Sequence, residues 1–347
     1  MLADEVDYVI GVDPHRDAHA IAVVEAGSGG LVFEWQVPAT VAGYAEALES
    51  ARTHAAGRRA WAIEGTGSFG AGLARFLAER RELVVEVGRL RRQRRSQAKT
   101  DALDALRTAR SVLGETHLAV PRLGGERDGL RALMVARESA LIAKKACLCQ
   151  LRALIVTCPE PLRAELTPLT RARLLARCAS LRPNRHKRED WRATLLALRS
   201  LAARARALTR EERGLEREIH TLVTQLAPQL LTEPGVGPIS AAQLVISWSH
   251  PGRLRSEAAF ARLAGAAPIP ASSGQTVRHR LDRGGDRKLN RALQTIVLTR
   301  RRQHPATIAY IERRRAEGKT SRESVRCLKR YLARHLYRLL EAPTAPA

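Results

Sequence analysis

The feature that most constrains the fold is a series of five short strand-like segments within the first 87 residues. The first three follow one another closely, and the last two alternate with segments of helical composition. Three strands in succession, followed by alternation with helices, are typical of a mixed-sheet α/β domain. The predicted strands are residues 8–13, 19–24, 31–37, 60–64 and 83–87. The predicted helices between them are residues 44–55 and 71–79.

Four carboxylates stand at prominent places in this pattern. Asp13 and Glu64 end two predicted strands, and Asp101 and Asp104 share one face of a helix that begins near Thr100. Four converging carboxylates repel one another unless cations neutralise them, and Mg²⁺ is the usual cation beside phosphates. Two such ions stabilise the attacking and leaving oxygens of a phosphoryl transfer. The plain alternatives are a turn role for Asp13 and helix-dipole stabilisation by the helical pair.

The charge of the chain is strongly uneven. The whole chain carries a formal net charge of +24, but residues 1–86 carry −6 and residues 87–347 carry +30. Such an excess of cations predicts a polyanionic partner, with nucleic acid preferred over an anionic membrane surface. A basic run without any acidic residue is expected to hold an RNA or DNA backbone. Its cations are Arg89, Arg91, Arg92, Arg94, Arg95 and Lys99.

In the middle of the chain, leucines and other apolar residues recur every seven residues. This heptad spacing favours a coiled coil over a globular helix. The repeating positions are Met134, Leu141, Leu148 and Ile155, and later Leu201, Leu208, Leu215 and Leu222. A second series fills the alternate core position and is interrupted by Glu212; its members are Leu198, Ala205, Ile219 and Leu226. Four prolines between residues 159 and 183 mark a turn region. We therefore expect an antiparallel helical hairpin that also offers a dimer surface.

Several classes of protein are disfavoured by composition. Aromatic residues make up only 4%, which argues against a single-strand binder that works by base stacking. No apolar run reaches the length of a membrane span, and the acidic N-terminus lacks the features of a signal peptide. Five cysteines without CxxC pairs disfavour structural zinc and a disulfide framework, and they fit a reducing cytoplasm. His15 and His19 lie near a predicted turn and are interpreted as structural.

Three N-terminal motifs resemble those of a known family. They are Gly11-Val12-Asp13, Ile63-Glu64-Gly65-Thr66-Gly67 and Lys99-Thr100-Asp101-Ala102-Leu103-Asp104-Ala105. They look like the signatures of DEDD-type insertion-sequence transposases, the insertion-sequence-110 family of bridge-RNA-guided recombinases. The resemblance implies a RuvC-like, ribonuclease-H-type N-terminal domain in which Asp13, Glu64, Asp101 and Asp104 bind metal.

The C-terminal part carries a second set of motifs. Pro234-Gly235-Val236-Gly237-Pro238 resembles a helix-hairpin-helix element, in which Gly235 and Gly237 let backbone N–H groups approach a phosphate. A basic segment surrounds Gly284-Gly285-Asp286. Its cations are Arg278, Arg280, Arg283, Arg287 and Lys288. On residue type alone, serines in such a loop are turn formers.

Residues 234–293 look like the C-terminal transposase domain of the same family, which carries a serine nucleophile directly before a glycine. Ser273 matches that position, with the adjacent Ser272 as the alternative. Ala271-Ser272 departs from relatives that place bulkier or charged residues there, so the choice between the two serines stays open.

Together these features predict an α/β plus all-α protein of three domains. They are a RuvC-like domain (1–120), a helical coiled-coil region (121–232) and a mostly helical transposase domain (233–347). The resemblance implies a cytoplasmic, nucleoid-associated recombinase that uses Mg²⁺ and Ser273. Its expected partners are donor and target DNA, a guide RNA, and further copies of itself through the coiled coil. The rival hypotheses are a junction-resolving nuclease without a serine step, a non-enzymatic nucleic-acid-binding protein, and a membrane-surface protein.

Overall fold

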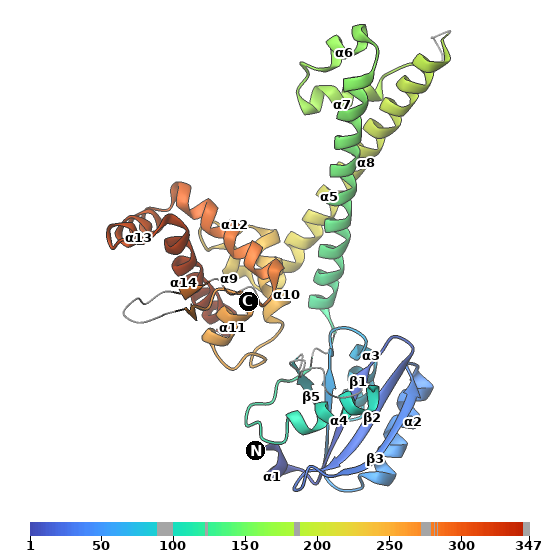
Figure 1. Ribbon diagram of the computed structural model, residues 1–347, viewed down its shortest axis with the longest axis vertical. Coiled ribbons are helices and arrows are strands. Elements are labelled where there is room, and N and C mark those ends of the chain that lie inside the picture. Colours follow the sequence, from blue (N-terminus) through green and yellow to red (C-terminus); the bar gives the residue numbers. More distant parts are fainter. Residues whose placement is uncertain are drawn as a thin grey trace. The chain divides into compact units, whose positions relative to one another are not determined.

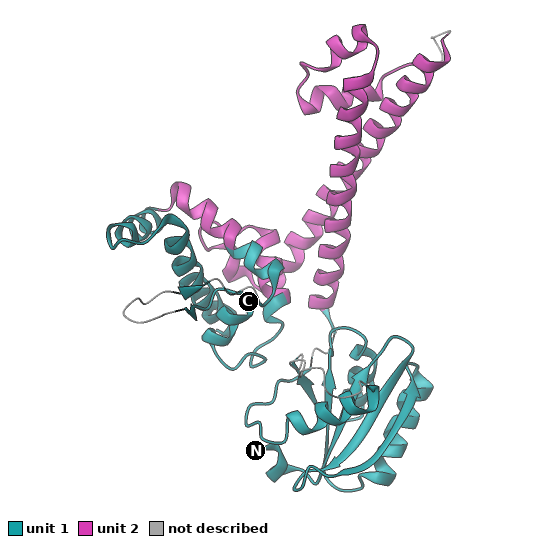
Figure 2. Cartoon of the chain, viewed as in Figure 1, with its two compact units in different colours: residues 1–125, 247–293, 305–347 teal, residues 126–246, 294–304 magenta. Residues whose placement is uncertain are grey.

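The fold was analysed in a computed structural model, which describes residues 1–88, 100–121, 124–183, 188–271, 279–280, 282 and 284–342. The chain divides into two compact units (Figure 2). Unit 1 contains residues 1–125, 247–293 and 305–347, and unit 2 contains residues 126–246 and 294–304.

The N-terminal part of unit 1 is built on a five-stranded sheet (Figure 1). Its strands are β1 (Tyr8–Pro14), β2 (Ala18–Glu25), β3 (Leu31–Pro38), β4 (Arg59–Glu64) and β5 (Leu83–Val87). The spatial order is β3-β2-β1-β4-β5. The first three strands pair antiparallel, and β4 and β5 continue the sheet parallel to β1. The predicted strands and the mixed-sheet α/β fold class are therefore confirmed.

Helices cover both faces of this sheet. Helices α2 (Val41–His54) and α3 (Ala71–Glu79) pack on one face against residues such as Ile10, Trp61 and Ile63. Helix α4 (Asp101–Ser111) packs on the other face, with α1 (Leu2–Glu5) beside it. Alternate residues of each strand point to opposite faces, as the two-residue period of a strand requires.

Helix α4 approaches strand β1 at Gly11 so closely that no side chain fits between them. A Cβ atom on Gly11 would lie 2.1 Å from the carbonyl oxygen of Ala105 and 2.5 Å from the amide nitrogen of Ala109. Small residues line the rest of this crossing, where Ala20 and Ala22 of β2 cluster with Ala105. The helix consequently lies directly on the backbone of the sheet.

Unit 2 contains a long antiparallel hairpin of α5 (Glu126–Thr157) and α8 (Glu189–Leu226), as the sequence predicts (Figure 1). Arg137 of α5 contacts Glu216 of α8 at 2.6 Å, and Lys144, further along α5, contacts Glu212. Glu212 interrupts the second heptad series because it forms this largely buried ion pair. Such a polar pair in an apolar seam fixes the register of two helices.

The hairpin core draws on both predicted heptad series, and Ile155 of the first series is itself buried. In α5 the fully buried residues include Ala140, Cys147 and Leu151, whereas Met134 and Leu141 are half-buried. In α8 the interrupted series supplies the buried Leu198, Ala205 and Ile219. The core of the hairpin thus mixes small residues with Leu151 and Leu198, both of which are fully buried.

The region between the two long helices is not a simple turn. It forms two short helices, α6 (Glu160–Leu166) and α7 (Arg171–Ala179), whose side chains join the core at the end of the hairpin. Pro159 is the N-cap of α6 and Pro161 lies in its first turn. Proline is tolerated in the first helical turn, where its missing N–H has no intrahelical partner. Pro159 and Pro161 therefore mark a helix start rather than an absence of helix.

The remaining elements are mostly helical. They are α9 (Pro228–Leu231), α10 (Pro238–Trp248), α11 (Glu257–Leu263), β6 (Ile269–Pro270), β7 (His279–Arg280), α12 (Arg287–Gln303), α13 (Pro305–Ala316) and α14 (Ser321–Glu341). Helices α11 and α14 pack through Phe260 and Tyr337, whose ring centroids are 5.7 Å apart. No described helix is long and apolar enough to cross a membrane.

We predict that Gly11→Ala destabilises the protein by about 1–3 kcal/mol, because the added methyl group overpacks the crossing of α4 and β1. Gly27→Ala is the matched control, since a Cβ atom there has nothing within 4 Å. Its effect should stay below about 0.5 kcal/mol. Urea unfolding followed by circular dichroism measures both values. Equal stability of the two variants would contradict the packing described at Gly11.

Candidate metal centre

Asp13 and Glu64 lie side by side at the ends of two neighbouring strands. The parallel register pairs Val12 of β1 with Ile63 of β4, so Asp13 and Glu64 are the next residues on adjacent strands. Val9 and Gly11 face α4, and by alternation so does Asp13; Ala60 and Ala62 do the same for Glu64. Both carboxylates therefore stand on the sheet face that α4 covers.

Helix α4 brings the second pair of carboxylates to the same place. The Thr100 side chain accepts a hydrogen bond of 3.3 Å from the amide of Leu103 and so begins the helix one residue before Asp101. Asp101 and Asp104 occupy its first turn, next to the residues that contact β1. Arg107 forms an ion pair of 3.1 Å with Asp104. The contact at Gly11 thus sets how far these carboxylates reach over β1.

His15 completes the cluster, although the sequence analysis treated it as structural. Its Nε2 atom lies 3.2 Å from Oδ2 of Asp13 and 3.3 Å from Oδ1 of Asp101. One ligand atom from each of these three residues lies within 4.8 Å of the others, a spacing compatible with one metal ion. The turn that joins β1 to β2 directs His15 back toward the end of β1. The i, i+4 spacing of His15 and His19 does not predict this placement, because the two residues do not lie on a helix.

His19 differs from His15 in its surroundings. It is fully buried and stacks on Tyr44, with ring centroids 5.6 Å apart. Burial lowers its pKa and so favours the neutral ring, as expected of a core residue. The structural interpretation therefore holds for His19. Asp17, in the same turn, is exposed and paired with Arg16 at 2.9 Å.

The electrostatics at Asp13 fit a bound cation. Burial raises the pKa of the Asp13 carboxyl, His15 opposes this rise, and the charges of Asp104 and Asp101 add to it. Ionised Asp13 is thus destabilised by lost hydration and by its acidic neighbours. A hard divalent cation removes both penalties, and carboxylate oxygens are the ligands that Mg²⁺ prefers. The residues present therefore fit the metal that the sequence pattern predicts.

The other predicted site residues have different environments. Gly235 has φ +76°, and a Cβ atom on it would lie 3.1 Å from the carbonyl oxygen of Ile296, so it packs tightly within unit 2. Gly237 has open space around it. Arg280, Arg287 and Lys288 have exposed side chains.

The Gly-Gly-Asp segment has a clear role in the fold. Asp286 accepts hydrogen bonds from the amides of Lys288 and Leu289 and thereby caps α12. A Cβ atom on Gly285 would lie 2.3 Å from the carbonyl oxygen of Leu263, so glycine is required there.

Several predicted residues lie outside the described part of the chain. They are Ser272, Ser273, Arg278, Arg283, Arg89, Arg91, Arg92, Arg94, Arg95 and Lys99. Their roles stay predictions.

Comparison with known proteins decides the family. Residues 10–158 match a DEDD family model of IS110 type described as "Transposase", and residues 227–312 match "Transposase IS116/IS110/IS902 family". Together the two matches cover more than half of the chain. The chain belongs to the IS110 transposase family. All four predicted metal-binding carboxylates of this IS110-family chain fall within the first match.

A curated relative is the "Insertion element IS110 uncharacterized 43.6 kDa protein" of Streptomyces coelicolor (strain ATCC BAA-471 / A3(2) / M145). It is 33% identical over 148 residues, which are 42% of this chain and 36% of the relative. The match thus spans about a third of the relative's length.

We predict that Mg²⁺ raises the melting temperature of the wild-type protein and that Asp13→Asn loses more than half of this rise. Without Mg²⁺, Asp13→Asn should melt higher than the wild type, because it removes a buried charge among like charges. Asp17→Asn is the control and should keep the full response, since Asp17 pairs with Arg16 outside the cluster. Differential scanning calorimetry measures all three. An unchanged Mg²⁺ response in Asp13→Asn would contradict the metal centre.

Proposed function

We propose that this IS110-family protein is a DNA recombinase that moves an insertion element by metal-dependent strand cleavage and exchange. The observation that carries the proposal is the placement of Asp13, Glu64, Asp101 and Asp104 at one end of one sheet face. The matches to transposase families support DNA as the substrate. A partly buried carboxylate cluster in a chain of net charge +24 is suited to phosphodiester chemistry rather than to simple DNA binding.

The proposed cofactor is Mg²⁺, held by the four carboxylates. When bound, Mg²⁺ stabilises negative charge on the attacking and leaving oxygens of a phosphodiester. Asp13 and Glu64 hold their positions through the rigid sheet, and Asp101 and Asp104 through the capped helix. His15 contacts two of these carboxylates and orients them.

Ser273 is the proposed nucleophile, with Ser272 as the alternative. The Ser273 Oγ atom loses its proton and forms a bond to phosphorus, while the bond from phosphorus to the 3′-oxygen breaks. The 3′-oxygen leaves with a proton as a free hydroxyl group, and the 5′-phosphate stays on serine. A DNA 3′-hydroxyl then attacks this phosphoserine, which restores the serine and completes the exchange.

Guidance by a non-coding RNA of the element is part of the proposal. Residues 87–347 carry a net charge of +30, enough to hold donor DNA, target DNA and RNA backbones together. The proposed contacts include the basic run from Arg89 to Lys99 and the cations Arg278, Arg280, Arg283, Arg287 and Lys288. The proposed division into three domains assigns catalysis to the first and third and assembly to the second.

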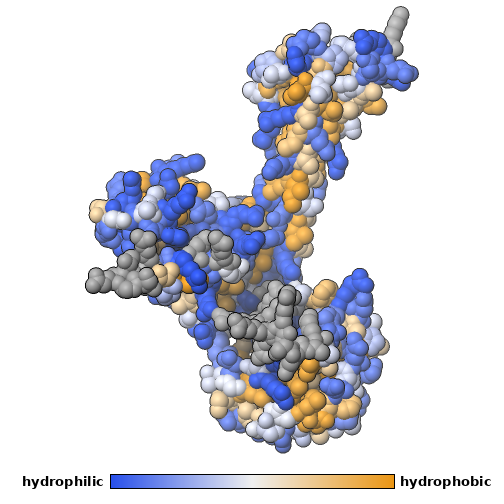
Figure 3. All heavy atoms as spheres, in the orientation of Figure 1, coloured by the Kyte–Doolittle hydropathy of each residue, from blue (hydrophilic) through white to orange (hydrophobic). Residues whose placement is uncertain are grey.

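We propose that the hairpin joins copies of the chain. Val135, Ile142, Cys149 and Val156 recur at seven-residue intervals on α5, and all four are exposed. The exposed fractions of Val135, Ile142 and Val156 are 56%, 65% and 67%. Figure 3 shows hydrophobic surface along the hairpin of α5 and α8. An apolar heptad stripe that the hairpin itself does not bury is suited to packing against the same stripe of a second copy.

The serine step predicts a covalent protein–DNA adduct. With element-junction DNA, Mg²⁺ and the RNA transcribed from the element's flank, the wild type should yield an adduct that resists denaturation. Ser273→Ala should lower adduct formation and strand cleavage by about 10³-fold or more. Denaturing gels with labelled DNA measure both quantities.

Ser272→Ala is the matched control, because it removes the same hydroxyl group one residue away. Loss of the adduct in Ser272→Ala instead would reassign the nucleophile. Full cleavage by both variants, with no adduct in the wild type, would replace the recombinase by a junction-resolving nuclease.

The proposed homodimer predicts that Ile142→Glu favours the monomer, because it places a charge in the centre of the apolar stripe. We expect its dimer dissociation constant to rise by at least tenfold. Gln150→Glu is the control, since it adds the same charge about 100° around the helix from Cys149. Sedimentation velocity measures the equilibrium, and circular dichroism checks that both variants stay helical. A dimer of unchanged stability in Ile142→Glu would contradict the proposed surface.

A further inference from the structure

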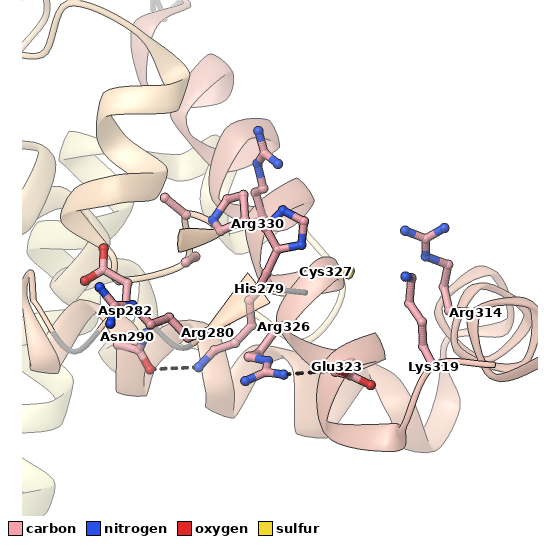
Figure 4. Close-up of a pocket in the computed structure, with 15 residues that line it drawn as sticks. His279, Arg280, Asp282, Asn290, Arg314, Lys319, Glu323, Arg326, Cys327 and Arg330 are labelled. Atoms are coloured by element: carbon pink, nitrogen blue, oxygen red, sulfur yellow. Dashed lines mark hydrogen bonds and ion pairs between the residues drawn. The ribbon is translucent and has the colours of Figure 1, made fainter. Parts of the chain in front are cut away.

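The C-terminal part of unit 1 contains a cavity of about 280 Å³ that the carboxylate site does not use. Figure 4 shows the residues that line it, which come from the segment before β6, from β7, α12, α13 and α14, and from the segment between α13 and α14. Its walls include Pro268 from the segment before β6, Arg280 from β7, Asn290 from α12, and Arg326 and Lys329 from α14. Helix α14 lies beyond residue 312, where the family match ends.

Cations dominate the lining. The lining has two carboxylates, Asp282 and Glu323. Its cations are Arg280, Arg314, Lys319, Arg326, Lys329 and Arg330. Glu323 is engaged elsewhere as well, because it forms the capping box of α14 with Thr320. Arg326 lies 3.9 Å from Glu323, so Glu323 offsets only part of the positive charge of Arg326. A net positive charge remains in the cavity.

Lys329 is the most informative of these residues. It is only 8% exposed, and its Nζ donates a hydrogen bond of 2.8 Å to Oδ1 of Asn290. The Asn290 amide donates a hydrogen bond of 2.6 Å to the carbonyl oxygen of Ala264, which fixes Oδ1 toward Lys329. Burial lowers the pKa of the Lys329 ammonium. No carboxylate within the described ranges forms an ion pair with it.

A buried ammonium with a neutral partner is costly to keep charged, whereas an anion beside it repays the lost hydration. Arginine supplies forked donors that match the oxygens of a phosphate, and lysine supplies a compact charge. The cavity is near the lower end of the sizes seen for ligand sites, about 300 Å³. It therefore accommodates a phosphate with an attached sugar rather than a whole oligonucleotide.

We propose that this cavity binds one backbone phosphate of a nucleic-acid strand, with Lys329 as its buried cation and Arg280, Arg326 and Arg330 around it. Strand β7, which lines the cavity, pairs with β6, Ile269 with Arg280, and the two strands flank residues 271–278 along the chain. That segment carries the proposed nucleophile. The inference rests on the proposed function in taking the phosphate from a nucleic-acid strand rather than from a free anion.

The test compares Lys329→Met with Arg322→Met in the full-length protein. Methionine keeps the length of the buried side chain without its charge. Arg322 is exposed on the same helix and does not line the cavity, so its variant controls for lost net charge. Fluorescence anisotropy with a labelled single-stranded DNA, over a range of salt concentrations, measures affinity and salt slope.

We expect Lys329→Met to bind the strand at least fivefold more weakly and to lose about 0.7 from the salt slope, the loss of one phosphate contact. Arg322→Met should change affinity by less than about twofold. Equal affinity and slope in Lys329→Met and the wild type would overturn the proposal. If Lys329→Met does not fold, Arg326→Gln replaces it with the same expected direction.

A second measurement distinguishes a strand phosphate from a free phosphate as the ligand. It also distinguishes failure of the cavity proposal from failure of the proposed function. Pyrophosphate should raise the melting temperature of the wild type, and Lys329→Met should lose this rise. If the wild type binds no DNA or RNA but shows this pyrophosphate response, the cavity binds free phosphates, and the proposed strand and function both fail. If DNA binds well while pyrophosphate has no Lys329-dependent effect, the function stands and the cavity proposal fails. If poly-glutamate binds as tightly as DNA and its binding depends on Lys329, the proposal that the cavity ligand is a phosphate is overturned.

Discussion

The packing of helix α4 on the bare backbone of strand β1 is the contact on which the candidate site depends. Gly11 and the neighbouring alanines leave no side chain between helix and strand, so the first turn of α4 lies beside the strand ends. Strand alternation brings Asp13 to the same sheet face, and the Thr100 cap fixes where the helix begins. A bulkier residue in this crossing would move the helix and separate the carboxylates that it carries.

Burial acts with opposite sign at the two charged places in this chain. It raises the pKa of Asp13 among acidic neighbours, and it lowers the pKa of Lys329 in a basic cavity. Each group is destabilised in its charged form, and each gains from a counterion of opposite charge. A divalent cation fits the first place and a phosphate fits the second. The acidic first 86 residues and the basic remainder thus supply complementary requirements of phosphodiester chemistry.

Sequence patterns were sufficient to predict the sheet and to locate the four carboxylates that we propose bind metal. Short strands ending in Asp13 and Glu64 can be located from alternation and turn residues, and the cap at Thr100 locates α4. The depth of burial of each heptad position could not be predicted, because the buried Ala140 and Cys147 carry a weaker hydrophobic signal than the leucines beside them. His15 and Lys329 were missed for a related reason. Each owes its place to a tertiary contact, with Asp101 or with Asn290, that leaves no local pattern.

The central claim is that the four carboxylates bind divalent metal in one cluster. Anomalous diffraction from crystals of the protein grown with Mn²⁺, which replaces Mg²⁺ and scatters anomalously, tests it most directly. The account predicts a peak within about 2.0–2.3 Å of carboxylate oxygens from Asp13 and at least one of Glu64, Asp101 and Asp104. A fully occupied Mn²⁺ peak elsewhere, with none at Asp13, would contradict it.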